Sequence, residues 1–173
     1  ESFKNTLTRW ADAIHRTTRE RVIRNNLFFR ENDPLLPILL ADNERHLREQ
    51  PYLNDVRIVV RSVLGTRDSV DVIVFTKDVL SIGGSFRMSR INKVLATVRE
   101  DNFSGRGDRL LVGAFFDAER TKRLAFGGEY ILRNVAGSFM DASFGFVEYE
   151  PTFNFGHRQD QMIYARFIKP LVN

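Results

Sequence analysis

Residues able to carry out chemistry are present in this sequence, but they do not stand in productive arrangements. The histidines, His15, His46 and His157, are scattered along the chain rather than spaced as metal ligands. Cysteine is absent, which excludes disulfides and thiolate metal sites. We therefore expect no metal site and no cofactor.

A glycine-rich segment at 102–108, Asn-Phe-Ser-Gly-Arg-Gly-Asp, contains a Gly-x-Gly pattern. A phosphate-binding loop needs a strand before it and the N-terminus of a helix after it. The residues after Asp108 have the pattern of a strand, so the segment is better interpreted as a β-turn than as a nucleotide site.

Two further patterns do not form a catalytic set. Gly137-Ser138 lacks the rest of a Gly-x-Ser-x-Gly nucleophile elbow. The carboxylates Asp141, Glu148 and Glu150 are typical of scattered surface or lumen residues rather than of an acid–base pair. We predict that the protein is not an enzyme and has no catalytic residues.

The elements that position these residues begin with two short helices in 17–51. Thr17 and Glu20 have the Thr-x-x-Glu spacing of a capping box, which predicts a helix start. The segment 32–34, Asn-Asp-Pro, ends the first helix, because Asn tolerates a left-handed backbone and Pro disfavours helix before it. A second apolar stripe at helical spacing, Leu36, Leu39, Leu40, Asn43 and Leu47, follows before Pro51.

The pattern then changes to the two-residue period of a β-hairpin. Val56, Ile58 and Val60 share one face of the first strand, with Arg57 and Arg61 on the other. A turn at 64–68 precedes the alternating Val70, Val72 and Val74 of the second strand. Two helices and a hairpin with one apolar face each predict a two-layer α/β unit. Its predicted core is Val22, Ile23, Leu27, Leu40, Leu47, Ile58, Val60, Val72 and Val74.

After residue 79, segments of alternating apolar and polar residues recur between turn residues. This repeat predicts an antiparallel β-meander without long helices. A soluble sheet with one buried face and a transmembrane β-barrel both have this alternation of apolar and polar residues. Both interpretations stay open on the pattern alone. The segments are Leu80–Met88, Lys93–Glu100, Arg109–Asp117, Arg123–Leu132, Ser138–Tyr149 and Gln161–Ile168.

Several motifs resemble BamA-like outer-membrane proteins, in which POTRA modules precede a bacterial surface antigen β-barrel. The order helix, helix, strand, strand and the stretch from Thr18 to Val74 resemble a POTRA module, with Asn32 where these modules usually carry Gly. The segment 101–108 resembles the family's Asn-x-x-Gly-x-Gly turn, 134–139 its Asn-x-x-Gly-Thr-Phe segment, and 166–171 an Arg-Pro-Leu strand end.

The resemblance implies a fold and a domain organisation. Residues 1–79 would form an α+β POTRA-like domain of β-α-α-β-β order, whose first strand falls within Arg9–Arg16. Residues 80–173 would form an antiparallel meander that is part of an outer-membrane barrel. In such a module the strand from Val70 to Thr76 is central and the strand from Val56 to Ser62 is an edge.

The resemblance also implies a non-enzymatic function in assembly, insertion or translocation of β-barrel clients. It places the protein in the bacterial outer membrane, with the N-terminal domain in the periplasm. Expected partners are unfolded outer-membrane clients, outer-membrane lipid and accessory assembly proteins, with self-association through open strand edges as a further possibility. The predicted client-binding edge is Val56, Arg57, Ile58, Val59, Val60, Arg61 and Ser62, which would bind clients by β-augmentation.

Composition favours a globular chain and leaves one other function class open. The chain has 173 residues, 43% hydrophobic and 28% charged, with a net charge of +4. The sequence contains no run of 18 apolar residues, so it predicts no transmembrane helix. The Arg57–Arg61 strand lacks an aromatic stacking platform, so we expect no nucleic-acid partner. The alternative is a soluble, non-enzymatic adhesion or scaffold protein with an α/β unit fused to an antiparallel sheet.

Overall fold

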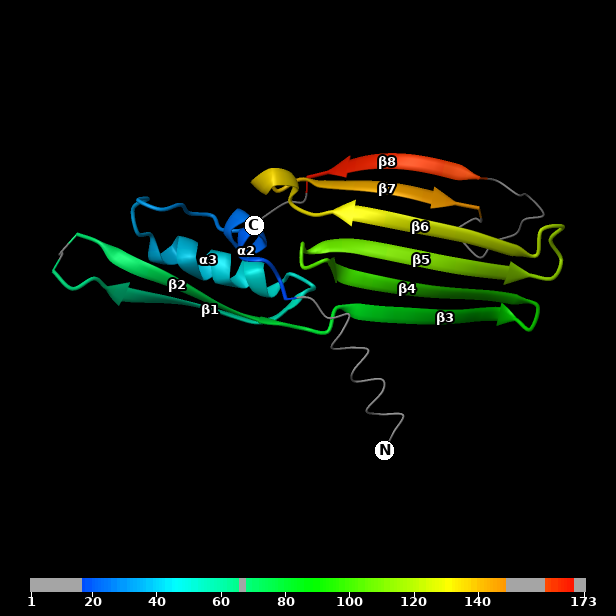
Figure 1. The fold of residues 1–173 in the computed structure, drawn as a ribbon, viewed down its shortest axis with the longest axis horizontal. Coiled ribbons are helices and arrows are strands. Elements are labelled where there is room, and N and C mark those ends of the chain that lie inside the picture. Colours follow the sequence, from blue (N-terminus) through cyan, green and yellow to red (C-terminus); the bar gives the residue numbers. More distant parts are fainter. Residues whose placement is uncertain (1–16, 66–67, 149–160, 170–173) are drawn as a thin grey trace, which may run out of the picture. The chain divides into compact units, whose positions relative to one another are not determined.

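The computed structural model describes residues 17–65, 68–148 and 161–169 (Figure 1). The described residues form mostly antiparallel sheet, with two α-helices. The chain divides into two compact units between Leu80 and Ser81, and each unit has its own cluster of buried apolar residues. In the part of the chain described, no helix has the length and apolar character needed to cross a membrane.

Unit 1 contains the predicted helix pair and hairpin. The helices are α2 (Glu20–Asn25) and α3 (Pro37–Arg48), and the strands are β1 (Leu53–Ser62) and β2 (Val70–Asp78). The strands pair antiparallel, and Ile58 lies opposite Val74. Pro37 occupies the first turn of α3, where its missing amide costs no hydrogen bond.

The predicted capping box at the start of α2 is wrong. The N-cap position is occupied by Arg19, which makes no side-chain cap bond. Thr18 instead donates from its backbone amide and its hydroxyl to the carboxylate of Asp78, at 2.8 and 2.7 Å. This long-range pair ties the entry of α2 to the end of β2.

The break between the helices follows the sequence prediction. Asn32 has a φ of 71°, the left-handed conformation that Asn tolerates better than most residues. The carboxylate of Asp33 accepts a 2.7 Å hydrogen bond from the amide of Arg30, and the amide of Asp33 donates to the Arg30 carbonyl. The turn therefore satisfies its own backbone groups.

The core of unit 1 lies at the base of the hairpin. Val60, predicted to be buried, is 42% exposed, because the turn end of the hairpin extends past the end of α3 (Figure 1). Asn43 is buried and joins the helices, since it accepts from the Phe28 amide and donates to the Asn26 carbonyl, both at 2.9 Å. The buried cluster is Ile23, Leu47, Tyr52, Leu53 and Val56, with Val22, Leu27 and Val74 packed against it.

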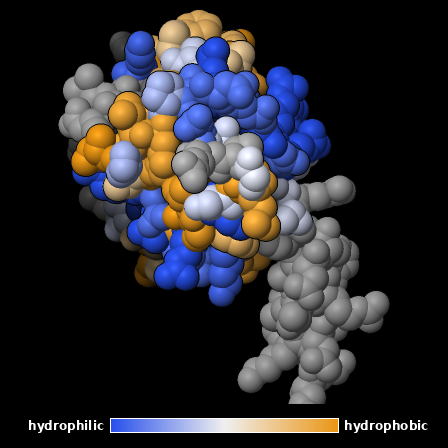
Figure 2. All heavy atoms as spheres, turned by 90° about the vertical axis from the view of Figure 1, so that its left-hand side faces the viewer, coloured by the Kyte–Doolittle hydropathy of each residue, from blue (hydrophilic) through white to orange (hydrophobic). Residues whose placement is uncertain are grey.

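Unit 1 also exposes apolar side chains. Figure 2 faces the side of the molecule on which the hairpin turn lies in Figure 1, and it shows hydrophobic patches among hydrophilic surface. The exposed large apolar residues of unit 1 include Leu35, Leu36, Ile38, Leu64 and Val70.

Unit 2 is a six-stranded antiparallel sheet in which each strand pairs with the next along the chain. The described residues after Leu80 contain no helix longer than the three-residue 3-10 turn Val135–Gly137, which confirms the predicted meander. The strands are β3 (Ile82–Arg90), β4 (Lys93–Phe103), β5 (Asp108–Asp117), β6 (Leu124–Leu132), β7 (Asp141–Val147) and β8 (Met162–Ile168).

We expect Leu47→Ala to destabilise unit 1 by about 2–5 kcal/mol, because Leu47 is fully buried in its core. Ile38→Ala, on the same helix but 71% exposed, should change stability by less than about 0.5 kcal/mol. Urea unfolding of the full chain, followed by the helical circular dichroism signal, measures both. Equal effects of the two substitutions would contradict this assignment of the core.

Candidate functional site

The predicted client-binding edge lies in β1, and two hydrogen bonds establish which of its amides point away from β2. The amide of Ile58 donates to the Glu44 carboxylate on α3 at 2.7 Å, and the amide of Val56 donates to Asp55 at 2.9 Å. Because backbone direction alternates along a strand, the amides of Val60 and Ser62 point the same way. These four residues therefore form the outward edge of β1.

Two carboxylates and an arginine already contact this edge. The Arg48 guanidinium on α3 lies 2.7 Å from a Glu44 carboxylate oxygen and 3.5 Å from the Asp55 carboxylate. One oxygen of Glu44 thus binds Arg48 while the other accepts from Ile58. We name Glu44, Arg48 and Asp55 the edge cluster. The sequence analysis missed it, since no periodic pattern links α3 to a strand amide.

The remaining predicted edge residues have different roles. Val59 is 38% exposed, and its amide points toward β2 by the same alternation, so it belongs to the hairpin pairing rather than to the outward edge. Arg57 is exposed on the same face of the sheet. The Arg61 guanidinium forms a 2.7 Å ion pair with Asp71, directly opposite on β2. Arg61 therefore supports the pairing of the two hairpin strands.

The far edge of β2 borders a groove. The described residues of unit 1 form a two-stranded sheet, and the predicted first strand, Arg9–Arg16, lies outside the described residues. The central position predicted for Val70 to Thr76 stays a prediction. The groove has a volume of about 1170 Å³, and its lining includes Ile23, Leu27, Leu39, Leu40, Val72 and Val74.

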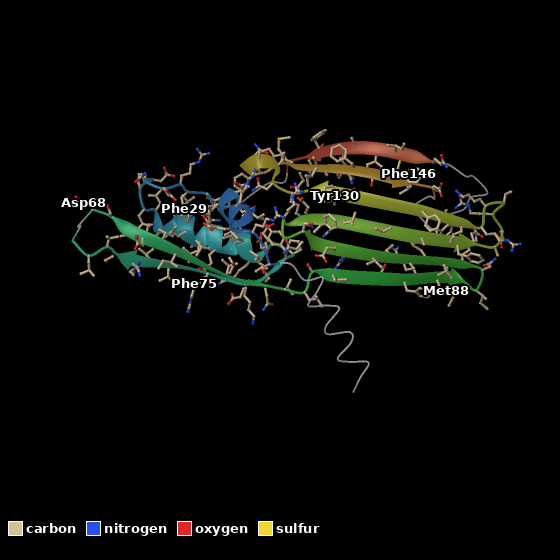
Figure 3. The ribbon with its side chains drawn as sticks, in the orientation of Figure 1. Phe29, Asp68, Phe75, Met88, Tyr130 and Phe146 are labelled. Carbon is tan, nitrogen blue, oxygen red and sulfur yellow. The ribbon has the colours of Figure 1, made fainter. Side chains whose placement is uncertain are left out.

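In unit 2 the strand register separates two chemically different faces. Residues directly opposite each other in an antiparallel pair point to the same face. Met88, Tyr130 and Phe146, labelled on β3, β6 and β7 in Figure 3, belong to one apolar face. Its exposed large members are Phe86, Met88, Val98, Val112, Phe116, Leu124, Phe126, Phe144, Phe146, Ile163 and Phe167.

Exposure on this sheet is inverted relative to an ordinary soluble sheet. Along β6, Ala125 is 0% exposed, whereas its neighbour Phe126 on the apolar face is 49% exposed. Ala125 packs with Leu95 and Phe115 on the opposite face, and the Arg120 guanidinium lies 5.7 Å from the Phe115 ring centroid. The large side chains of the apolar face are thus exposed, while the opposite face buries Ala125 and Leu95.

Beside the apolar cluster of Leu95, Phe115 and Ala125, the opposite face carries charged, polar and glycine residues. The Arg166 guanidinium on β8 reaches Glu129 on β6 at 2.9 Å and the hydroxyl of Ser143 on β7 at 3.3 Å. The ring of Tyr164 lies over Gly145, directly opposite on β7, so closely that a Cβ at Gly145 would overlap it. This face is therefore held by polar bridges across strands and by a ring-on-glycine contact.

An arginine–carboxylate network closes one end of the sheet. The Arg133 guanidinium donates to the carbonyls of Asp101 and Gly107 at 3.2 and 2.9 Å, and to the Asp101 carboxylate at 3.2 Å. Arg109 also pairs with Asp101, which is 4% exposed. Asp108 accepts from the Tyr130 hydroxyl at 2.7 Å. The network fixes the β4–β5 turn against the end of β6.

The Gly-x-Gly segment is a turn, as predicted. The Asn102 side chain accepts from the Gly107 amide at 2.9 Å, and the Asn102 carbonyl accepts from the Gly105 amide at 2.8 Å. Both glycines have positive φ, 71° and 72°, and strand β5 follows instead of a helix. These amides are used within the turn rather than presented to a phosphate.

The candidate chemical residues are not gathered into a cluster. Within the described ranges, no group of three or more His, Asp or Glu side chains is arranged to hold a metal ion. His46 packs against Phe28, with ring centroids 4.9 Å apart, and burial lowers its pKa despite the nearby charge of Glu49. His15, His157 and Glu150 lie outside the described residues.

Comparison with protein-family models and with curated proteins gives no match. Among solved structures, the fold is similar to the crystal structure of BamA from Haemophilus ducreyi lacking POTRA domains 1-3, with a TM-score of 0.61 and 17% identity. The match covers 80% of this chain and 26% of that chain, so it spans about a quarter of the solved BamA chain. The fold is thus that of part of a BamA-like structure.

We expect Gly145→Ala to destabilise the sheet of unit 2 by about 1–3 kcal/mol, because the added methyl group overlaps the Tyr164 ring. Urea unfolding in detergent micelles, followed by the β-sheet circular dichroism signal, measures the loss. In a Tyr164→Ala background the same substitution should cost less than about 0.5 kcal/mol, since the clash is gone. An equal loss in both backgrounds would show that the ring contact is not its cause.

Proposed function

We propose that this chain is part of a non-enzymatic bacterial outer-membrane protein that assembles or translocates β-barrel clients. Unit 2 would be a segment of its membrane-embedded barrel, and unit 1 a periplasmic POTRA-like module that receives client strands. The observation that carries the proposal is the apolar face that extends across all strands of the six-stranded sheet.

An apolar face of this extent needs an apolar environment. Exposed patches larger than a few hundred Å² mark interaction or membrane surfaces. The described part of unit 2 contains no second sheet and no α-helix to cover the face. Hydrocarbon would satisfy Phe86, Val112 and Phe126 without a further protein layer. Bacterial barrels have this alternation of apolar outward and polar inward residues.

The strands have suitable lengths and a suitable inner face. Strands β3 to β6 have 9, 11, 10 and 9 residues, close to the roughly 9–11 residues of a tilted transmembrane strand. Strands β7 and β8 have 7 residues each within the described ranges. The Arg166–Glu129 bridge is of the kind that a polar lumen accommodates.

The fold likeness to the BamA structure supports the assembly role, and the proposal extends it to this chain's partners. Unit 1 has the helix-helix-strand-strand order of a POTRA module and a strand with outward amides. A client strand could add to that edge through main-chain hydrogen bonds, whatever its side chains. Unfolded outer-membrane clients, outer-membrane lipid and accessory assembly proteins are the proposed partners.

The soluble adhesion or scaffold alternative requires a partner layer over the apolar face of unit 2. The two functions differ in the environment that face meets, so one pair of substitutions separates them. Val98 and Thr97 are neighbours on β4, and their side chains lie on the apolar and polar faces respectively.

We expect Val98→Arg to disfavour insertion of the full chain into liposomes by about 2–4 kcal/mol, the cost of an arginine on a lipid-facing strand near the bilayer midplane. Thr97→Arg adds the same charge to the lumen face and should cost much less. Flotation of the protein with lipid vesicles after dilution from urea measures the inserted fraction. If Val98→Arg inserts as well as Thr97→Arg, the face does not meet lipid.

The edge of β1 can be tested with two prolines. Val60→Pro removes an outward amide of β1, and Val70→Pro removes an amide that points away from β1 on β2. The two residues are similarly exposed, at 42% and 40%, so damage to the core should be comparable.

The readout is crosslinking of a peptide with the β5 sequence, Asp108–Asp117, to a photo-reactive residue at Val59. We expect Val60→Pro to reduce labelling severalfold and Val70→Pro to leave it near the unmodified level. If the peptide labels the protein without a proline substitution no more than background, client binding at β1 is refuted. Loss with Val70→Pro alone would place the binding edge on β2.

A further inference from the structure

The outward edge of β1 is not uniformly available to a client. The amides of Ile58 and Val56 already donate to the carboxylates of Glu44 and Asp55. The amides that these acids bind belong to the residues of β1 nearer Leu53, whereas Val60 and Ser62 lie toward the hairpin turn. The strand edge thus has a carboxylate-bound half and a turn-side half.

The carboxylate-bound half is held by charge. A hydrogen bond from an amide to an ionised carboxylate is stronger than one to a neutral carbonyl. Arg48 contacts both acids and orients the second oxygen of Glu44. The Glu44 side chain is 23% exposed, so water competes for it less than for the more exposed Asp55, at 68%.

We propose that Glu44 is a displaceable guard of the client-binding edge, an inference that rests on the proposed function. An incoming strand must place its own carbonyl oxygen on the Ile58 amide, which is possible only after the Glu44 carboxylate leaves. The client and Glu44 therefore compete for one donor. Arg48 stays near the displaced carboxylate, so the guard returns when the client departs.

The position of the guard also gives docking a direction. A client carbonyl can first accept from the amides of Ser62 and Val60, beyond the edge cluster. Pairing then extends toward Ile58, where each further bond replaces a carboxylate. A short or poorly extended segment stops before Ile58, whereas a full barrel strand has enough carbonyls to displace Glu44. The guard thereby selects long extended strands, and this selection does not depend on contacts with their side chains.

The test compares Glu44→Ala with Asp42→Ala in the full chain. Asp42 lies on the same helix and pairs with Arg45 at 3.8 Å, and no hydrogen bond or ion pair shown by the structure joins it to β1. A photo-reactive residue at Arg57 reports the guarded half of the edge, because Arg57 is exposed and neighbours Ile58. The probe is the peptide with the β5 sequence, and a version with proline at alternate positions sets the background.

We expect Glu44→Ala to lower the peptide concentration for half-maximal labelling about tenfold, the scale of one charged hydrogen bond lost by the competitor. Glu44→Gln should give a smaller decrease, since its amide oxygen still accepts but carries no charge. Asp42→Ala should match the unmodified protein. Hydrogen exchange of the Ile58 amide in the absence of peptide should be faster in Glu44→Ala, which shows directly that the guard is gone.

The outcomes separate this inference from the proposed function. Background labelling of the unmodified protein at both Val59 and Arg57 would refute client binding itself. Labelling that is specific but equal in Glu44→Ala and Asp42→Ala would overturn the guard alone. If peptide labelling at Arg57 is weaker in both Glu44→Ala and Glu44→Gln than in the unmodified protein, the role of Glu44 is purely structural. That result would also overturn the guard.

Discussion

Cross-strand register is the constraint on which the structure of unit 2 depends. Each of the six strands pairs with its sequence neighbour, so every pair must keep the same parity for the faces to match. A slip of one residue in a single strand would move its apolar set to the polar face. The polar bridges resist such a slip, because Arg166 meets Glu129 and Ser143 in only one register. The ring of Tyr164 over Gly145 adds a steric marker of that register.

In unit 1 the main constraint is that the backbone amides of a small sheet need hydrogen-bond acceptors. Its two described strands cannot satisfy all of each other's amides, and an unpaired strand edge invites association. Side chains from α3 and from the strand itself supply acceptors for part of β1. The helix thus contributes to the edge through Glu44 and to the core through Leu47, one turn further along the same side of α3.

The sequence predicted features that depend on local pattern and missed those that depend on pairs distant along the chain. Dyad alternation located the six strands, and Asn32 indicated the left-handed break between the helices. The Thr17–Glu20 motif failed because Thr18 binds Asp78, 60 residues away. The outward direction of the Ile58 amide depends on the β1–β2 register, which alternation within one strand cannot supply. Glu44 was unidentifiable for the same reason, since it reaches β1 from another element.

The edge cluster has a property that arginines on the strand face could not provide. Arg61 pairs with Asp71 across the hairpin, so its charge acts on the face of the sheet and leaves the edge amides open. Under the proposed function, a carboxylate bonded to the amide of Ile58 would act on the group that a client needs. It would then compete with the client's main chain, which is common to all strands, and would discriminate by extended conformation and length. A receptor for clients of many sequences needs that kind of selection, because side-chain pockets would exclude most of them.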